Sequence, residues 1–295
     1  MEPNPTASTN ADQIAYWNGH QGKSWLARQQ SQDAILAPIA QALYERAGLR
    51  AGEHVIDVGC GCGDTSIELA RRVAPGGHVL GVDISAPMLD RARERIQPGT
   101  SVEFTLADAT VHPFEPARAD LLFSRFGVMF FEDPLRSFRN LRAALRPGGR
   151  IAFACWREPM RNGWLMAPLQ EAYKHVPKMP DLGPDAPGPF AFQSEVRVRG
   201  ILEGAGFASV EFEAIDLTLD IANGQGIDAA MDTATGVGPA SRAMDGQPAE
   251  LQAAARAAIR AMLAQRLVGE TVPFPASIWI VRAIRPLTSA TDARF

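Results

Sequence analysis

A short apolar run leads directly into three alternating glycines, and this junction limits the possible fold more than any other part of the chain. Residues 55–58 form the run, and after them come Gly59, Gly61, Gly63 and a segment of helical character at 65–72. Glycines allow positive φ and let a ligand lie against bare backbone, while the start of a helix offers unpaired N–H groups. The sequence therefore predicts a strand, a ligand-binding turn and a helix in succession.

Apolar runs and helical segments alternate through the first half of the chain. The runs at 55–58, 79–82, 102–106, 121–124 and 151–155 are predicted strands, and 65–72, 87–96 and 134–145 are predicted helices. A further helix is predicted before the first strand, ending at Gly48, and a turn at 147–149 precedes the fifth strand. Short strands separated by helices of this length indicate βαβ units and a parallel sheet.

The second half of the chain is less regular. Seven prolines between residues 158 and 192 predict a loop-rich excursion in which regular structure is short and interrupted. Helices are predicted at 194–205 and 251–267, and strands at 210–219 and 277–284. Residues 1–10 are polar and irregular and are predicted to form a disordered tail, with helical signals from Ala11.

Composition excludes some classes of function. The chain has 295 residues with 29 Lys plus Arg against 33 Asp plus Glu, a net charge of −4, and no block of basic residues. Binding to a phosphate backbone needs clustered positive charge, so nucleic acid is not an expected partner. No apolar stretch is long enough to cross a bilayer and no secretory signal opens the chain, so we expect a soluble, cytoplasmic protein without a membrane partner.

Two acids indicate what the glycine turn binds. Asp83 ends the second predicted strand, 20 residues after Gly63, which is the spacing of a carboxylate that holds ribose hydroxyls in doubly wound sheets. Several adenosine cofactors satisfy this rule. The glycines run G-x-G-x-G, however, and Asp57 lies two residues before Gly59, where added negative charge would not favour a dinucleotide pyrophosphate. A cationic cofactor suits that acid, and S-adenosylmethionine carries a sulfonium and an α-ammonium group.

Five motifs between residues 45 and 155 together resemble a known family. They are VIDVGCGCGDT, GVDIS, LADAT, DLLFSRFGVMFF and LRPGGRIAFACW, in this order. In these motifs the chain resembles the class I S-adenosylmethionine-dependent methyltransferases, in particular the small-molecule branch of types 11 and 25. The resemblance implies a Rossmann-like doubly wound α/β fold with a seven-stranded sheet, mostly parallel with an antiparallel last strand, plus a helical cap insertion.

The resemblance also implies a set of cofactor-binding residues. Asp57 and the glycines would line the methionine part, Asp83 would hold the ribose, Ile84 and Met88 would flank the adenine, and Asp108 would accept from the adenine amino group. The segment YWNGHQGKSW is similar to a family lid element that closes over the cofactor. The full predicted set is Trp17, Trp25, Asp57, Gly59, Cys60, Gly61, Gly63, Thr65, Asp83, Ile84, Met88, Asp108, Ala109, Ser124 and Arg125.

The sequence offers candidates for the catalytic base and for the residues that bind the methyl acceptor. Methyl transfer is an in-line displacement, so positioning supplies much of the rate and a base is needed only where the acceptor must lose a proton. His20, His112 and His175 are weak candidates for that base, and the catalytic residues stay unknown. Candidate substrate-binding residues are Tyr16, Met129, Trp156, Arg161, Asn162 and Trp164.

These features divide the chain into three predicted regions. Residues 1–44 would hold the tail and lid helices, 45–157 the cofactor-binding core, and 158–295 the rest of the sheet, with insertions at 158–192 and 222–272 covering the acceptor pocket. Cys60 and Cys62 lack the partners of a zinc site, so no metal is expected.

The expected function is transfer of a methyl group from S-adenosylmethionine to a small, largely apolar molecule, by a monomer or homodimer. A non-catalytic S-adenosylmethionine-binding sensor or partner subunit is the main alternative, because no obligatory catalytic residue is visible. A nicotinamide oxidoreductase and an RNA methylase are more distant alternatives.

Overall fold

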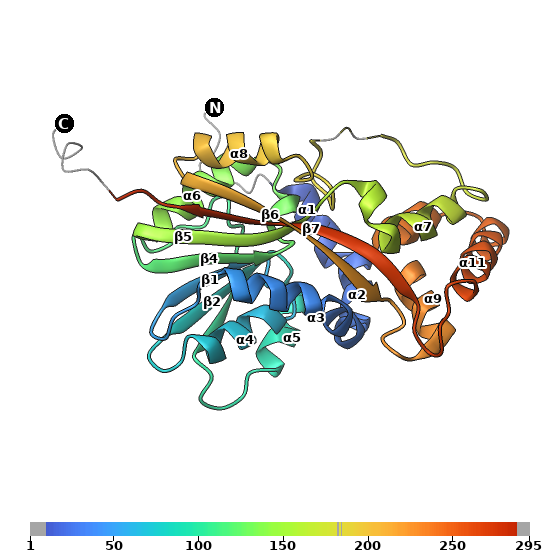
Figure 1. The fold of residues 1–295 in the computed structure, drawn as a ribbon, viewed down its shortest axis with the longest axis horizontal. Coiled ribbons are helices and arrows are strands. Elements are labelled where there is room, and N and C mark those ends of the chain that lie inside the picture. Colours follow the sequence, from blue (N-terminus) through green and yellow to red (C-terminus); the bar gives the residue numbers. More distant parts are fainter. Residues whose placement is uncertain (1–9, 182, 184, 288–295) are drawn as a thin grey trace.

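The centre of the molecule is one seven-stranded sheet with the strand order β3-β2-β1-β4-β5-β7-β6 (Figure 1). The computed structural model describes residues 10–181, 183 and 185–287. The strands are β1 (His54–Val58), β2 (His78–Asp83), β3 (Val102–Leu106), β4 (Ala119–Arg125), β5 (Leu145–Trp156), β6 (Ala208–Asp220) and β7 (Pro273–Ile284). Strands β1 to β5 are parallel, and β7 is antiparallel to both of its neighbours. The predicted fold class is confirmed.

The fifth strand begins earlier than its apolar run. Its register with β4 shifts: Ala119 of β4 lies opposite Leu145, but Leu121, two residues later, lies opposite Arg150. The predicted turn at 147–149 is therefore an irregularity within the strand, and Gly148 takes a positive φ of 78° there.

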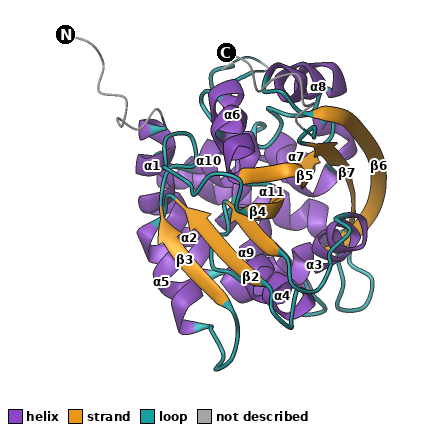
Figure 2. Cartoon of the chain, turned by 90° about the vertical axis from the view of Figure 1, so that its left-hand side faces the viewer, coloured by secondary structure: helices purple, strands orange, loops and turns teal. Residues whose placement is uncertain are grey.

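Helices cover both faces of the sheet, as the alternation of elements requires. On one face lie α3 (Gln29–Arg46), α4 (Asp64–Arg72) and α5 (Ala86–Glu94), and on the other lie α6 (Pro134–Ala144) and α8 (Glu195–Gly204) (Figures 1 and 2). Phe123 from β4, Phe138 from α6 and Phe153 from β5 are fully buried between these layers. Burial of such side chains stabilises the packing of the helices on the sheet.

Two short helices, α1 (Ala11–Asn18) and α2 (His20–Ala27), precede the first long helix. Asn10, which was assigned to a disordered tail, is instead 3% exposed and donates to Asp108 Oδ1 at 2.6 Å. Its side-chain oxygen accepts from the backbone N–H of Glu132 at 2.9 Å. The tail prediction is wrong at this residue because a polar side chain is buried there by distant partners; residues 1–9 lie outside the described residues.

A group of helices packs together beyond the ends of β6 and β7, and we call it the cap. It consists of α7 (Gly163–Ala172), α9 (Gly226–Gly236), α10 (Gly238–Met244) and α11 (Ala249–Ala264) (Figure 1). The predicted loop-rich excursion thus contains a ten-residue helix with Pro168 in its interior. Packing of the helix overcomes the lost hydrogen bond, since Trp164, Leu165 and Leu169 are buried.

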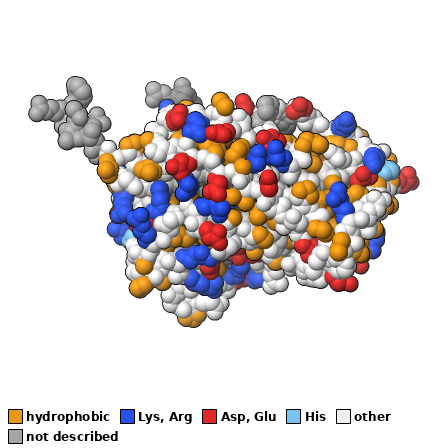
Figure 3. Space-filling view, in the orientation of Figure 1, with side chains coloured by type: hydrophobic (Ala, Val, Ile, Leu, Met, Phe, Trp, Pro, Cys, Tyr) orange, Lys and Arg blue, Asp and Glu red, His pale blue; other side chains and the backbone are white. Residues whose placement is uncertain are grey.

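No single kind of side chain dominates the face of the molecule that Figure 3 shows. Acidic and basic side chains are intermingled over much of the face in Figure 3, and exposed hydrophobic side chains are scattered among them. Among the helices of the described residues, none has the length and apolar character needed to cross a bilayer.

Candidate functional site

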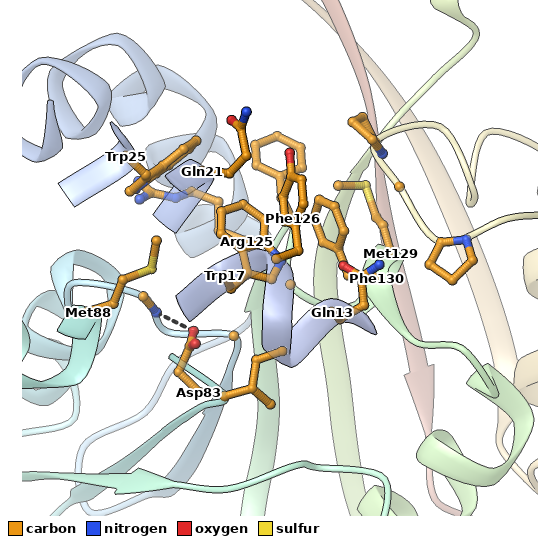
Figure 4. Close-up of a pocket in the computed structure, with 18 of the residues that line it drawn as sticks. Gln13, Trp17, Gln21, Trp25, Asp83, Met88, Arg125, Phe126, Met129 and Phe130 are labelled. Carbon is orange, nitrogen blue, oxygen red and sulfur yellow. Dashed lines mark hydrogen bonds between the residues drawn. The ribbon is translucent and has the colours of Figure 1, made fainter. Parts of the chain in front are cut away.

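A cavity of about 570 Å³ lies where the parallel strands end. Strands β1, β2, β4 and β5 run in the same direction, so the loops after Val58, Asp83, Arg125 and Trp156 meet at one edge of the sheet. Helices α1 and α2 and the cap complete the wall. Figure 4 shows Asp83 and Met88 on one side of this cavity and Met129 and Phe130 on the other, with Trp17, Arg125 and Phe126 between them.

The glycine turn after β1 is shaped by two different needs. Gly59 has a φ of 69°, and a Cβ on it would lie 2.6 Å from Cα of Gly127, so the turns after β1 and β4 touch backbone to backbone. Gly61 has a φ of 54°, and a Cβ there would meet only the Met88 sulfur at 3.9 Å. The backbone of Gly61 is therefore bare on its cavity side, as a cradle for a ligand requires.

Asp83 presents a carboxylate at the end of β2. Its Oδ2 accepts from the N–H of Gly61 at 2.8 Å (Figure 4), and its Oδ1 accepts from the N–H of Ser85 at 2.8 Å. Burial raises the pKa of this carboxyl, and the backbone donors oppose that rise. The two hydrogen bonds hold both oxygens in a fixed orientation at the cavity wall.

Asp108, at the end of the following strand, also lines the cavity. Its Oδ1 accepts from Asn10 and from the backbone N–H of Thr110 at 2.9 Å. Ile84 and Met88 line the same cavity. Two acceptors together with apolar groups suit a ligand that carries polar groups on a flat ring system.

Asp57 lies beneath the glycine turn and not on the cavity wall. It is fully buried, and its Oδ2 accepts from the hydroxyls of Thr65 and Ser66, each at 2.6 Å. Its Oδ1 is buried and accepts no hydrogen bond from the described residues. Burial raises the pKa of this carboxyl to about 6, although the two hydroxyls lower it. Such an unsatisfied buried acceptor favours a positively charged group nearby.

Arg125, directly after β4, lies between two acids on the cavity floor. Its guanidinium is 3.0 Å from Asp64 and 3.6 Å from Asp33, and its side chain is 10% exposed. Ser124, by contrast, faces the core: its hydroxyl donates to the carbonyl of Val58 at 2.7 Å and accepts from the N–H of Gly127 at 3.1 Å. Ser124 therefore joins the turns after β1 and β4 to each other.

Aromatic side chains form much of the remaining wall. Phe126 and Trp156 are stacked with ring centroids 4.0 Å apart, and Trp164 lies 5.3 Å from Trp156. Trp17 from α1 meets Phe130 edge-on at 5.3 Å. This part of the cavity is apolar and broad enough to take a flat molecule.

Most of the predicted site residues meet in this one cavity. Those on its wall are Tyr16, Trp17, Trp25, Gly59, Cys60, Gly61, Thr65, Asp83, Ile84, Met88, Asp108, Ala109, Arg125, Met129, Trp156 and Trp164. Gly63 is not among them: a Cβ there would lie 2.7 Å from the Phe104 ring, so this glycine serves the packing of α4 against the neighbouring elements.

Two predicted substrate residues are placed away from the cavity wall. Asn162 is fully buried, accepts from the N–H of Ser277 at 2.9 Å and donates to the carbonyl of Arg157 at 3.2 Å, so it fastens the turn after β5 to β7. Arg161 is half exposed and pairs with Glu158 at 3.2 Å. Their positions near the end of β5 were predicted well, but their side chains are used in the turn itself.

The three candidate histidines are also elsewhere. His20 is exposed at the start of α2, and His175 is exposed after α7. His112 packs edge-on against Phe114, and burial lowers its pKa. None of the three is among the residues that line this cavity, so the role of a base stays a prediction without support from the cavity wall.

Several wall residues were missed by sequence reasoning. They are Asn10, Gln13, Gln21, Asp33, Leu36, Phe126, Phe130, Arg242 and the turn 187–189. Phe126 and Phe130 lie in the motif DLLFSRFGVMFF at the end of a predicted strand and so had a local signal. The others come from segments distant in sequence, which reach the cavity through the packing of α1, α2, α3 and the cap or through the turn 187–189.

The charges around the cavity indicate the kind of ligand it holds. The described wall residues include six acids, Asp12, Asp33, Asp64, Asp83, Asp108 and Glu132, and two arginines, Arg125 and Arg242. A bare glycine turn, oriented carboxylates and an excess of acids fit an adenosine-bearing ligand with a cationic end.

Comparison with known proteins identifies relatives of the same kind. Residues 55–149 match the model of a methyltransferase domain family. Over 178 residues the chain is 31% identical to a demethylmenaquinone methyltransferase of Clavibacter sepedonicus, covering 55% of this chain and 68% of that protein. An uncharacterised protein of Mycobacterium tuberculosis is 29% identical over 171 residues, which is 58% of this chain and 59% of the relative. The chain thus aligns with about six tenths of the length of such mycobacterial relatives.

A solved structure has a similar fold. Phosphoethanolamine N-methyltransferase 2 of Haemonchus contortus, in complex with phosphomonomethylethanolamine and S-adenosylhomocysteine, superposes with a TM-score of 0.57. The superposition covers 96% of this chain and 62% of that chain at 17% identity. At this identity the likeness concerns the fold alone.

Proposed function

The chain belongs to the class I S-adenosylmethionine-dependent methyltransferases, and on this premise we propose that it transfers the methyl group of S-adenosylmethionine to a small, largely apolar acceptor. The carrying observation is the single cavity whose acidic, glycine-lined half adjoins an aromatic half. A cofactor in the first half and an acceptor in the second would lie next to each other, as direct methyl transfer requires.

In this proposal, each part of the cofactor has a partner in the chain. Asp83 accepts from the ribose hydroxyls, Asp108 accepts from the adenine amino group, and Gly61 lets the methionine part lie on bare backbone. When bound, S-adenosylmethionine supplies an activated methyl group, whose carbon–sulfur bond breaks as the bond to the acceptor forms. The rings of Trp17 and Trp25, with centroids 6.2 Å apart, close the cavity from the side of α1 and α2.

The acceptor would lie against the stacked pair of Phe126 and Trp156. Trp164 and Leu165 from α7 and the turn 187–189 enclose the same space, so the insertions at 158–192 and 222–272 would cover the acceptor. Exclusion of water and fixed orientation are the contributions that these side chains make to the rate. The relative from Clavibacter sepedonicus is named for demethylmenaquinone, and an aromatic wall supports a flat acceptor for this chain too.

The proposal is tested by titrating the protein with S-adenosylmethionine, S-adenosylhomocysteine and NAD in a calorimeter. We expect micromolar binding of the first two, about −8 kcal/mol, and none of NAD. The variant Asp83→Asn should bind S-adenosylmethionine about 30-fold or more weakly, because a charge-assisted contact to the ribose is lost. Asp90→Asn is the matched control, since Asp90 is exposed on α5, pairs with Arg93 and is not among the residues that line the cavity.

Two outcomes would contradict the proposal in different ways. Equal affinity of Asp83→Asn and the wild type would remove Asp83 from the cofactor site. Turnover is measured separately as S-adenosylhomocysteine formed with a panel of phenols, hydroquinones, aromatic amines and thiols, with and without a ring carboxylate. Tight cofactor binding with no turnover on the panel would favour the alternative of a non-catalytic sensor or partner subunit.

A further inference from the structure

The two arginines of the cavity wall differ in how they are neutralised. Arg125 is enclosed by Asp33 and Asp64, with Arg95 completing the cluster at 3.1 Å from Asp33. Arg242, from α10 of the cap, forms no ion pair with any carboxylate of residues 10–181, 183 and 185–287. Arg242 is therefore the cation of the described wall whose charge is left for a ligand.

Arg242 is held in place by an aromatic ring and not by an acid. Its guanidinium carbon lies over the ring of Tyr16, 5.8 Å from the centroid, so the cap and α1 meet at this pair. A cation over an aromatic face is attracted by the ring, and an arginine in this arrangement keeps its N–H donors free for other partners. The guanidinium is exposed at the cavity mouth, where a ligand group can reach it.

Tyr16 adds a donor beside the guanidinium. Burial raises the pKa of its hydroxyl, Arg242 lowers it and Asp245 raises it further, and the net rise keeps the phenol protonated at neutral pH. Asp245 is exposed and does not belong to the cavity wall. The Tyr16 hydroxyl and the five guanidinium donors of Arg242 belong to the same cavity wall and can together bind a planar anion such as a carboxylate.

Apolar side chains of α7 lie near this pair. Trp164 and Leu165 of α7 line the same part of the wall, and Gly238, which begins α10, lies against Leu165: a Cβ on Gly238 would be 3.1 Å from its side chain. A ligand at this place therefore meets aromatic and aliphatic groups on its body and a cation with a hydroxyl at its edge. The acidic residues that line the cavity would repel a negatively charged ligand group from the rest of it.

From these observations, and resting on the proposed function, we propose that the methyl acceptor is an aromatic carboxylic acid whose carboxylate is held by Arg242 and Tyr16. The rings lie along the wall formed by Phe126 and Trp156. The carboxylate anchors one end at the mouth, so the opposite end of the molecule points inward toward the glycine-lined half. Arg242 is in this view a specificity residue, because it selects the acceptor by charge.

The test uses a matched pair of probes, 2-naphthoate and 2-naphthamide, which have the same rings and differ in charge. Their binding is measured by calorimetry to protein saturated with S-adenosylhomocysteine. We expect the wild type to bind the acid about fivefold or more tightly than the amide, because an exposed arginine contributes modestly through a charged hydrogen bond. The advantage of the acid should shrink as salt is raised, since the guanidinium is exposed.

Variants assign the effect to Arg242. Arg242→Met keeps the length and apolar stem but should bind the two probes equally, while Arg242→Lys should keep part of the preference for the acid. Arg260→Met is the matched control: Arg260 is an arginine of the cap on α11, exposed and paired with Asp228, and it does not line the cavity. Unchanged affinity of Arg242→Met for S-adenosylhomocysteine shows that the variant is folded.

The outcomes separate this inference from the proposed function. If S-adenosylhomocysteine fails to bind the wild type, the proposed function is wrong and this inference falls with it. If S-adenosylhomocysteine binds but the acid binds no more tightly than the amide, including the case in which neither binds, only the inference is overturned. A preference for the acid that persists in Arg242→Met would also overturn it.

Discussion

At the scale of single residues, the side chain of Asp57 is fully buried away from water. A carboxylate with no exposure is stable only if hydrogen bonds or positive charge compensate for its lost hydration. Thr65 and Ser66 compensate for one oxygen, and the other oxygen has no donor among the described residues. The pKa of about 6 expresses this imbalance, because it means that the folded protein holds a proton that the unfolded chain releases.

Stability should therefore depend on pH through Asp57. The folded pKa of about 6 lies above the ordinary value of 3.8, so the folded state binds more protons between these values and stability falls as pH rises through that range. The full effect is about 3 kcal/mol between pH 4 and pH 7, as an order of magnitude. Asp57→Asn removes this dependence, so the wild type should gain stability relative to the variant as pH is lowered from 7 to 4.

Urea unfolding at pH 4, 5, 6 and 7 measures that difference for both proteins. Asp90→Asn serves as the control for the change from carboxylate to amide, because Asp90 is exposed. A difference between wild type and Asp57→Asn that stays constant over the range would show that Asp57 has an ordinary pKa.

At the scale of elements, the turn between β1 and α4 assigns different tasks to its glycines. A Cβ on Gly61 would meet only the Met88 sulfur, at 3.9 Å, whereas a Cβ on Gly63 would lie 2.7 Å from the Phe104 ring and 2.9 Å from the Ala92 side chain. Both have positive φ, which is 54° at Gly61 and 81° at Gly63. The alternation of glycines thus combines a ligand cradle with a close contact between helices and sheet.

Alanine substitutions should separate these tasks. Gly63→Ala combines backbone strain with a clash in the core and should cost roughly 2–4 kcal/mol of stability. Gly61→Ala adds strain only, about 1 kcal/mol, but places a methyl group where the cofactor is proposed to lie, so it should weaken S-adenosylmethionine binding by tenfold or more. Thermal unfolding and calorimetry give the two readouts. A Gly61→Ala variant with normal cofactor affinity would mean that the cofactor does not lie on this turn.

At the scale of the whole molecule, two segments distant in sequence close the cavity together. Ser24 of α2 donates to the carbonyl of Gly236 at 2.5 Å, and Arg28 pairs with Asp232 of α9 at 2.6 Å. Trp17 of α1 in turn accepts at its carbonyl from Ser85, next to the cofactor half. The first helices and the cap are therefore linked to each other around the cavity.

Cofactor binding should stabilise both segments at once. With S-adenosylhomocysteine added, amide hydrogen exchange should slow in 11–27 and in 226–244, while the outer helices α6 and α8 stay unchanged. In Arg28→Met, protection of 226–244 should become smaller while protection of 11–27 remains. Protection confined to the glycine turn would show that the two segments do not close together on the ligand.

Local pattern was enough to predict the sheet, the glycine turn and the acid at the end of β2. Strand runs, helix periodicity and positive-φ glycines depend on neighbours a few residues away, so they are visible in the order of residues. Asp83 was predicted from its spacing of 20 residues after Gly63, which is typical of a ribose-binding carboxylate in a doubly wound sheet. Packing overrode local pattern at Pro168, because burial of one face stabilised a helix that proline disfavours.

Several contacts on the cavity wall were decided by tertiary structure alone. Asn10 reaches Asp108 over 98 positions in the chain, and Arg242 meets Tyr16 although they belong to opposite ends of the sequence. Asn162 follows β5, as predicted, but its side-chain oxygen accepts from the N–H of Ser277 on β7, and the residue does not line the cavity. Such contacts depend on how whole elements pack, and a single sequence contains no local signal for which distant side chain will become a neighbour.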